Sequence, residues 1–203
     1  MCLDNGTDLG FAQVDIDRGV HVCQIYTSKE ERNNSLLKFI LKGIEQKEAS
    51  ACFSDREFSD FFNSYVKEQK VPVNEGAEIE NFVFHNAEDV YFEGNVFNPD
   101  HILNSLNDFY EKSVSGRFEG TRVIGEMLPE IQSIEGGKRL LEYESRVNLF
   151  LEDHPVTTVC QYAEHSFDGA MIMDVLKVHP MLVVHGAVVR NPFYMKPEEV
   201  LDN

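Results

Sequence analysis

Short runs of β-branched and apolar residues alternate along the chain with segments whose apolar residues recur at helical spacing. The run VHVCQIY at residues 20–26 predicts a first strand, and apolar positions three and four apart over residues 36–44 predict the helix that follows. Further strands are predicted at 49–54, 79–86, 121–127, 156–162 and 181–186, and further helices at 58–66, 102–110, 137–153 and 168–178. This alternation is typical of a three-layer α/β fold, a mostly parallel sheet with helices on both faces.

Polar residues indicate where helices begin and where the domain ends. Ser54 and Glu57 have the spacing of a capping box, and Asn98 followed by Pro99 is typical of an N-cap and first turn. Residues 1–19 are polar and rich in Gly and Asp with no sustained period, so we expect a flexible leader there. Residues 20–201 are then expected to form a single domain that ends in an edge strand and a tail.

Length and charge exclude several classes of protein. The 203 residues suit one domain, and no run approaches the roughly 20 apolar residues of a membrane span, so we expect a soluble protein. The 35 acidic and 18 basic residues leave a formal charge of −17, which repels nucleic acid and anionic lipid. Because the first residues lack the basic and then apolar stretches of a secretory signal, we expect a cytoplasmic protein that contacts neither nucleic acid nor membrane directly.

The cysteines and histidines do not form a known metal-binding motif. Cys2, Cys23, Cys52 and Cys160 are widely separated, and the chain has neither a C-x-x-C nor an H-x-x-x-H pair. His21 would share a strand face with Cys23, and Cys160 one with Tyr162, so a cluster forms only if those two strands lie close together. We therefore predict no disulfide framework, no metal site and no cofactor, and we interpret His179, before Pro180, as a favourable charge at a helix end.

Polar residues gather where the predicted strands end. In an open parallel sheet, ligands bind beyond the carboxyl ends of the strands, where loops and helix N-termini converge. The polar residues at these ends are Tyr26, Thr27, Asp55, His85, Asn86, Glu126, Gln161, Tyr162 and His185. A single polar residue at such a position commonly just begins a loop, so position alone does not identify a site.

One strand and one helix carry charges where the pattern predicts burial. Arg122 and Glu126 share a face of the strand at 121–127, and Glu144 lies within the apolar stripe of the helix at 137–153. A buried guanidinium needs a partner, so we expect Arg122 to pair with Glu144 or Glu126. Either this is a structural ion pair, or the surplus carboxylate faces a small pocket with a raised pKa.

The usual motifs of enzymes are missing. A phosphate-binding G-x-x-x-x-G-K-[ST] would follow the first strand, but the segment TSKEERNNS has no glycine. The sequence also lacks a G-x-S-x-G elbow, a G-x-G-x-x-G turn and an H-E-x-x-H pair. We therefore predict a protein that is not an enzyme.

Several blocks of sequence resemble one family in the right order. The blocks are HVCQIYTSKEE, LKGIEQKEA, EDVYFEGNVFNPD, TRVIGEM, LLEYESRVN, VCQY, LKVHP and NPFY. Together they resemble the MEDS domain, the methanogen/methylotroph, DcmR-type sensory domain. The resemblance implies a fold like the RecA/KaiC-type P-loop ATPases with a degenerate phosphate loop. It also implies a regulatory role in which a small organic molecule, such as a simple hydrocarbon derivative, is sensed for transcriptional or two-component signalling.

The family's blocks single out a set of positions in this chain. They are His21, Tyr26, Tyr91, Gly94, Arg122, Glu126, Glu144, Cys160, Tyr162, His179, Asn191 and Tyr194. Together with the strand-end pattern, they predict a ligand pocket lined by His21, Tyr26, Glu126, Cys160 and Tyr162. Arg122, Glu144, Tyr91 and His179 are predicted to support these residues from behind.

The resemblance and the strand-end pattern together predict a non-catalytic sensory domain that binds a small organic ligand. Because no DNA-binding, PAS or kinase segment accompanies the domain, we expect a partner protein in trans, a kinase or a transcription regulator. One alternative is a degenerate RecA-like module that binds nucleotide weakly or acts as an oligomeric scaffold, for which the aromatic-rich surface suits a homodimer. Another is a thiol enzyme or redox sensor, which requires a lowered thiol pKa at Cys160 or Cys23.

Overall fold

A computed structural model describes residues 6–12, 16–71, 81–116 and 118–202. Its central sheet has seven strands in the order β5-β4-β6-β7-β3-β8-β9. Every neighbouring pair is parallel except β8 and β9, which form an antiparallel hairpin at one edge. The strands are β3 (His21–Tyr26), β4 (Ala49–Ser54), β5 (Phe82–Asn86), β6 (Thr121–Glu126), β7 (Val156–Ala163), β8 (Met181–Val184) and β9 (Ala187–Arg190). A second, two-stranded sheet pairs β1 (Gly6–Thr7) with β2 (Ile16–Asp17).

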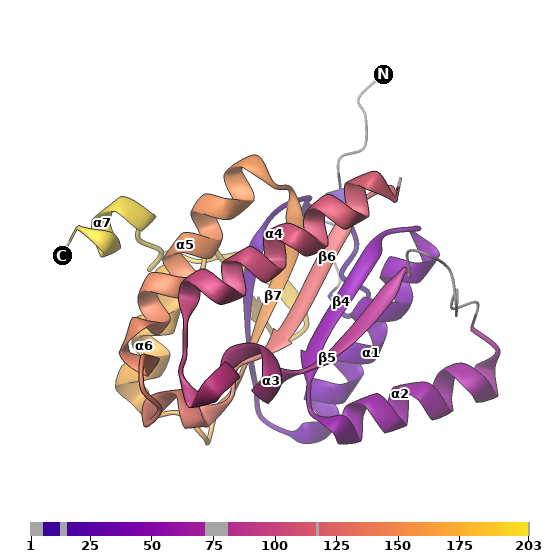
Figure 1. The fold of residues 1–203 in the computed structure, drawn as a ribbon, viewed down its shortest axis with the longest axis horizontal. Helices are drawn as coiled ribbons and strands as arrows, with labels where there is room; N and C mark the ends of the chain where they lie inside the picture. The colour runs from indigo at the N-terminus through magenta and orange to yellow at the C-terminus, as the bar shows by residue number, and fades with distance from the viewer. Residues whose placement is uncertain (1–5, 13–15, 72–80, 117, 203) are drawn as a thin grey trace.

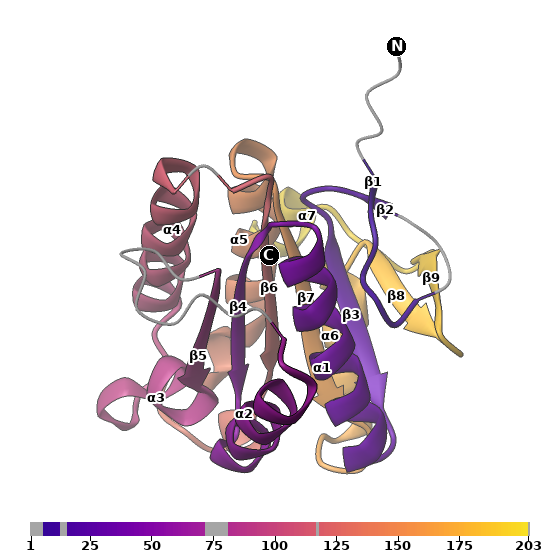
Figure 2. The same ribbon diagram turned by 90° about the vertical axis from the view of Figure 1, so that its right-hand side faces the viewer.

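Helices cover both faces of the central sheet, as the sequence predicts. The α-helices are α1 (Lys29–Glu45), α2 (Arg56–Gln69), α3 (Ala87–Tyr91), α4 (Pro99–Ser115), α5 (Leu140–Asp153), α6 (Gly169–Val178) and α7 (Pro197–Leu201). Helices α1 and α2 pack on one face, and α4, α5 and α6 pack on the other (Figures 1 and 2). We call these the α1 face and the α5 face. Within the described residues, no helix combines the length and apolarity needed to cross a membrane.

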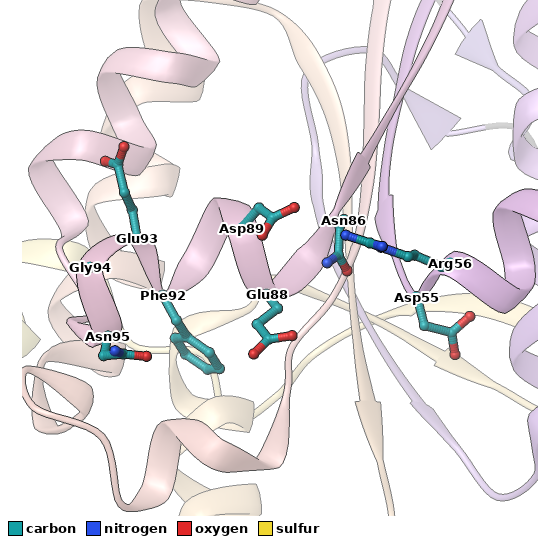
Figure 3. A pocket seen from close by; sticks show the side chains of 9 residues that line it. All are labelled: Asp55, Arg56, Asn86, Glu88, Asp89, Phe92, Glu93, Gly94 and Asn95. Atoms are coloured by element: carbon teal, nitrogen blue, oxygen red, sulfur yellow. The ribbon is translucent and has the colours of Figure 1, made fainter.

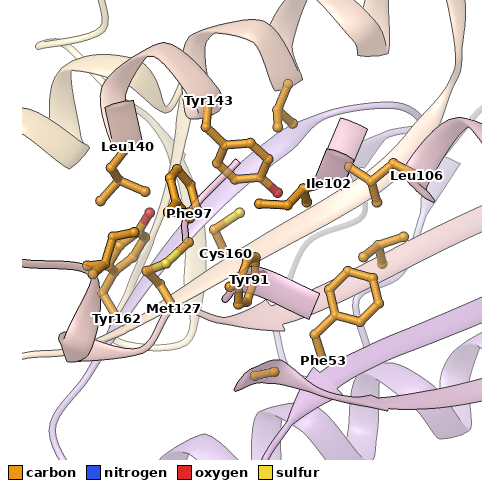
Figure 4. Close-up of a cluster of buried hydrophobic side chains, with 14 of the residues drawn as sticks. Phe53, Tyr91, Phe97, Ile102, Leu106, Met127, Leu140, Tyr143, Cys160 and Tyr162 are labelled. Atoms are coloured by element: carbon orange, nitrogen blue, oxygen red, sulfur yellow. The ribbon is translucent and has the colours of Figure 1, made fainter. Parts of the chain in front are cut away.

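Side chains alternate between the two faces along each strand and build two cores. On β6, Val123 joins the core of the α5 face, and Ile124 joins the core of the α1 face. The α5-face core is rich in rings and includes Tyr91, Phe97 and Tyr143 (Figure 4). Because every strand of the parallel centre is buried on both sides, a polar side chain there has to find its partner inside the protein.

Local capping explains where the helices start and corrects one prediction. The side chain of Asn98 accepts from the backbone N–H of Asp100 at the start of α4, as the sequence predicts. The predicted capping box at Ser54 is wrong. Asp55 caps α2 by accepting from the Phe58 N–H at 2.7 Å, while Ser54 is the last residue of β4 and is fully buried.

The described part of the predicted leader belongs to the packed domain. Thr7 and Leu9 are both 0% exposed, and Leu9 lies in the core of the α1 face. The prediction of a flexible leader is therefore wrong at these positions, because an apolar side chain inside a polar stretch still contributes to the core. The leader positions 1–5 and 13–15 lie outside the described residues.

Arg122 is fully buried on the α1 face, but its partner is neither predicted acid. Its guanidinium forms an ion pair with Glu48 and donates to Thr7 Oγ1 at 2.9 Å and Gln46 Oε1 at 2.8 Å. Glu126 shares the face of Arg122, but four residues of extended strand separate them by about 13 Å. Glu144 lies on the α5 face and is out of reach. The predicted pairing is therefore wrong, and Arg122 does not support Glu126.

The Arg122–Glu48 pair predicts a large and specific stability effect. Substituting Arg122→Met leaves the Glu48 carboxylate buried without its main partner, so the free energy of unfolding should fall by about 3–5 kcal/mol. Urea unfolding measures this change. The matched control is Lys42→Met, which removes the more exposed pairs with Asp8 and Glu45 and should cost less than about 1 kcal/mol. Equal losses in the two variants would contradict a stabilising role for the buried pair.

Candidate functional site

An ion-pair cluster closes the carboxyl ends of β3 and β6, and all of its members are buried except Asp55, which follows β4 and is partly exposed. Arg32 Nη1 donates to the Glu126 carboxylate at 2.7 and 3.0 Å and to Asp55 Oδ2 at 2.8 Å. Tyr26 donates to Glu126 Oε1 at 2.6 Å, and Ser54 donates to Glu126 Oε2 at 3.1 Å. We call these five residues the Arg32 cluster. Both oxygens of the Glu126 carboxylate are therefore occupied by donors of the protein itself.

The electrostatics of the Arg32 cluster favour a permanent pair over an open ligand site. Burial of Tyr26, and then its hydrogen bond to Glu126, raises the pKa of the phenol, so Tyr26 stays a donor. Burial alone would raise the pKa of Asp55, but the Arg32 hydrogen bond and the Phe58 N–H hold it below its usual value. Sequence reasoning found Tyr26 and Glu126 but missed Arg32, because the polar segment around it was interpreted as a loop.

The segment after β3 does not form a phosphate cradle. Only Thr27 and Ser28 connect β3 to α1, and Ser28 caps the helix by accepting from the Glu31 N–H at 3.2 Å. Glu31 in turn accepts from both the backbone N–H and the hydroxyl of Thr27 at 2.9 Å. Glu30 and Glu31 thus place carboxylates at the positive end of the helix dipole, where a phosphate would otherwise bind.

The other predicted pocket residues lie on the opposite face of the sheet. His21 and Cys160 occur on the neighbouring strands β3 and β7, and both side chains point to the α5 face. His21 Nε2 lies 3.3 Å from Cys160 Sγ and 3.3 Å from Glu144 Oε2. Glu144 Oε2 also lies 3.6 Å from His179 Nε2, and Glu144 Oε1 accepts from Tyr162. We call His21, Glu144, Cys160 and His179 the His–Glu–Cys cluster, a set of side chains able to hold a metal ion.

A single pocket lined by all five predicted residues does not exist. His21 and Tyr26 are five positions apart on one strand, an odd number, so their side chains leave opposite faces of the sheet. Tyr91 packs on the α5 face beside Gly125, where an added Cβ would meet the Tyr91 hydroxyl at 2.3 Å. Tyr91 and Glu144 therefore lie on the face opposite Glu126, and Glu144 contacts His21, Cys160 and Tyr162. His179 ends α6 as predicted, but the prediction that it supplies a favourable charge there is wrong, because its full burial, followed by the neighbouring His21, lowers its pKa to about 4 and keeps it neutral.

The buried thiols lack the chemistry of a reactive cysteine. Burial, followed by the nearby Glu144 carboxylate, raises the pKa of both Cys160 and Cys23 above its usual value. A nucleophilic or redox-sensing thiol needs the opposite shift and access to solvent. A thiol enzyme or redox sensor requires a lowered thiol pKa, and neither Cys160 nor Cys23 meets this requirement.

Two open cavities lie next to each other at the β5 edge of the sheet. The first, the acidic pocket, has a volume of about 720 Å³ at the carboxyl ends of β4 and β5 (Figure 3). Its lining residues are Asp55, Arg56, Asn86, Glu88, Asp89, Phe92, Glu93, Gly94 and Asn95. The second, the edge pocket, has a volume of about 430 Å³. It is lined by Ala51, Phe53, Phe84, His85, Asn86, Asp89, Val90, His101, Ser105 and Phe109.

The edge pocket combines apolar walls with a few polar groups. Phe53 and Phe109 supply aromatic surface, and His85, His101 and Ser105 supply hydrogen-bonding groups. Desolvation, with a smaller contribution from Lys112, lowers the pKa of His85, which keeps the imidazole neutral near pH 7. Of the strand-end residues noted in the sequence, Asp55, His85 and Asn86 line these pockets. The residues that α4 contributes were missed, because their place beside β5 depends on helix packing.

The Arg32 cluster predicts a stability effect with a defined pH dependence. Substituting Arg32→Met leaves Glu126 and Asp55 without their shared cation, so the free energy of unfolding at neutral pH should fall by about 3 kcal/mol. In the wild type, the pKa of Asp55 is lower in the folded state than in the unfolded state. Asp55 therefore stabilises the fold at pH values above its unfolded-state pKa, and this stabilisation is lost as the pH falls through its folded-state pKa. Between about pH 7 and pH 3, the free energy of unfolding measured with a chemical denaturant should therefore fall less steeply in Arg32→Met than in the wild type.

The control for this experiment is the neighbouring exposed Arg56. Arg56→Met should leave both the stability and its acid dependence as in the wild type. An Arg32→Met variant that matched this control would show that the cluster is not a structural constraint.

Comparisons with known proteins agree with this fold and identify a family. Among solved structures, a KaiC-like protein of the hyperthermophilic archaeon Pyrococcus horikoshii OT3 superposes with a TM-score of 0.58 at 12% sequence identity. The match covers 87% of this chain and 78% of the other, and it supports a RecA-like fold. A search of curated proteins found no matching relative. Residues 20–180 match the family described as the methanogen/methylotroph, DcmR sensory domain, and the chain therefore belongs to the MEDS family of sensory domains.

Proposed function

We propose that this chain is a non-catalytic sensory domain that binds a small organic molecule in the edge pocket and passes its state to a partner protein. The observation that carries the proposal is the edge pocket itself, whose volume of about 430 Å³ lies in the range of small-molecule sites. Membership of a sensory-domain family supports a signalling role. The closed Arg32 cluster supports a ligand position beside β5 in preference to the ends of β3 and β6.

The lining of the pockets limits the chemistry of the ligand. Aromatic walls favour an apolar body, and the neutral His85 with Asn86 favours a hydroxyl, carbonyl or amino group. Four carboxylates line the acidic pocket next to it, and the chain carries a net charge of −17. Both features disfavour anions, because a ligand carboxylate or phosphate would enter a field of like charge. The proposed ligand is therefore an uncharged or cationic small organic molecule, which includes simple hydrocarbon derivatives.

A ligand in the edge pocket would touch the segments best suited to relay a signal. Asp89 and Val90 belong to α3, and His101 and Ser105 belong to α4, so the ligand bridges these helices and the edge strand. A ligand that binds one arrangement of α3 and α4 more tightly shifts the population toward it. In this proposal, a kinase or a transcription regulator reads the shifted arrangement in trans.

Blocking the edge pocket should abolish stabilisation by ligands. Ser105 lines the pocket from an exposed position of α4, so Ser105→Trp places a large ring in the cavity with little cost to the fold. A thermal-shift screen with neutral and cationic small organic molecules, alcohols and amines among them, should raise the unfolding temperature of the wild type. The same compounds should leave Ser105→Trp unchanged.

The neighbouring Asn104 provides the matched control, since it is exposed on the same helix and does not line the edge pocket. Asn104→Trp should respond to the compounds as the wild type does. Hits that stabilise Ser105→Trp and Asn104→Trp equally would place the ligand elsewhere and overturn the proposed pocket.

Weak nucleotide binding is the second candidate function, because the fold resembles that of a KaiC-like protein. The two-residue connection after β3 and the carboxylates of the first turn of α1 argue against it. Isothermal titration of the chain with ATP and magnesium should therefore give no binding heat. Saturable binding that weakens in a Thr27 or Lys29 variant would contradict this account and favour the nucleotide module.

A further inference from the structure

The His–Glu–Cys cluster draws its side chains from four separate segments. His21 lies on β3, Cys160 on β7, Glu144 on α5, and His179 directly follows α6. All four residues are buried, with at most 5% of any of them exposed. Their ligand atoms, His21 Nε2, His179 Nε2, Glu144 Oε2 and Cys160 Sγ, lie within 4.8 Å of one another.

The hydrogen bonds behind the histidines fix their tautomers. Asn148 Nδ2 donates to the backbone oxygens of Glu144 at 3.0 Å and Val178 at 2.7 Å. The amide is therefore oriented with Oδ1 toward His21 Nδ1, 3.2 Å away, and Oδ1 accepts the Nδ1 proton. His179 Nδ1 lies 2.8 Å from the backbone oxygen of Val175 and donates to it. In the neutral form of each imidazole, these hydrogen bonds therefore leave an unprotonated Nε2 facing Glu144.

This arrangement brings three hydrogen-bond acceptors close to a single donor, the Cys160 thiol. Two Nε2 lone pairs and a carboxylate oxygen converge, and the Cys160 thiol can donate its one proton to only one of them. His179 Nε2 has no hydrogen-bond partner within the described part of the chain. An added proton on His21 would satisfy its contact with Glu144 but would still leave His179 Nε2 unpaired. A single cation in the centre would satisfy all four atoms.

Four of the six separations between the ligand atoms fit one ion bound by four ligands, and the other two lie within 4.8 Å. In tetrahedral coordination at the usual N, O and S bond lengths, neighbouring ligand atoms lie about 3.3–3.8 Å apart. The contacts of His21 Nε2 with Glu144 Oε2 and Cys160 Sγ are both 3.3 Å. Glu144 Oε2 lies 3.6 Å from both His179 Nε2 and Cys160 Sγ. We propose that the His–Glu–Cys cluster is a closed site for a divalent transition-metal ion, with zinc as the occupant best suited to two nitrogens, one oxygen and one sulfur.

Charge balance and topology indicate what the metal would do. Binding displaces the Cys160 proton to solvent, so one thiolate and one carboxylate neutralise the two positive charges of the ion in the buried site. With all four ligands supplied by the protein, the site has no open position for a substrate, which is typical of a structural metal. The ion would join β3, β7, α5 and the end of α6, and it would stabilise the side of the sheet away from the edge pocket.

Cobalt substitution tests the site directly in the 203-residue chain. After dialysis against a chelator, with circular dichroism to verify that the chain is folded, titration with Co²⁺ should produce tetrahedral visible bands and a thiolate-to-cobalt charge-transfer band. Equimolar Zn²⁺ should remove both and raise the unfolding temperature. Cys160→Ser should eliminate the charge-transfer band, whereas Cys23→Ser should retain it, since Cys23 is also buried on the α5 face but outside the cluster.

A second variant tests the hydrogen bond behind His21. Asn148→Ala removes the acceptor that fixes the tautomer, so Co²⁺ affinity should fall by about 10–100-fold while the visible spectrum keeps its shape. A folded wild-type chain that shows no cobalt spectrum, and no thermal response to Zn²⁺, overturns the proposal. A charge-transfer band that survives Cys160→Ser but is lost in Cys23→Ser overturns it as well.

Discussion

The ion pair between Arg32 and Glu126 is the constraint on which the rest of the site depends. A buried guanidinium and a buried carboxylate are costly apart, and here each also satisfies a further neighbour, Asp55 for the cation and Tyr26 for the anion. A phosphate at this position would have to displace carboxylates from Arg32 in a chain of strongly negative charge. The pair therefore closes the ends of β3 and β6, and the open cavities lie at the β5 edge instead.

The buried charged groups lie in separate clusters on the two faces of the sheet. The α1 face holds the Arg122–Glu48 pair at the amino end of β6 and the Arg32 cluster at its carboxyl end. The α5 face holds the His–Glu–Cys cluster between β3, β7 and α5. Each group ties a helix or loop to the central strands, which favours a rigid centre. In the proposed account, ligand binding acts on α3 and α4 at the periphery, where movement does not require breaking a buried charge pair.

Periodicity predicted the layers of the fold, because apolar spacing is a local property of strands and helices. The run at 49–54 became β4, and Asn98 caps α4 as expected. The predictions that were wrong, the partner of Arg122 and the flexible leader, depended on long-range geometry. Arg122 shares a face with Glu126, but strand length separates them, and the leader around Leu9 packs against residues far away in the sequence.

The candidate sites show the same limit. Motif spacing argued against a metal site, yet His21, Glu144, Cys160 and His179 meet only because β3 and β7 are neighbours and α5 covers them. No local pattern contains that information. Arg32 was likewise hidden in a polar segment, and its role depends on the position of Glu126 94 residues later.

Chemical-shift mapping by NMR tests the central claim most directly. The account predicts that a stabilising small organic ligand perturbs backbone amides of β5, α3 and α4, around His85, Asp89 and Ser105, while the amides of residues 27–32 stay unchanged. Perturbations concentrated at residues 27–32 and Glu126 would contradict it, since they would mean that the ligand opens the Arg32 cluster and binds at the ends of β3 and β6.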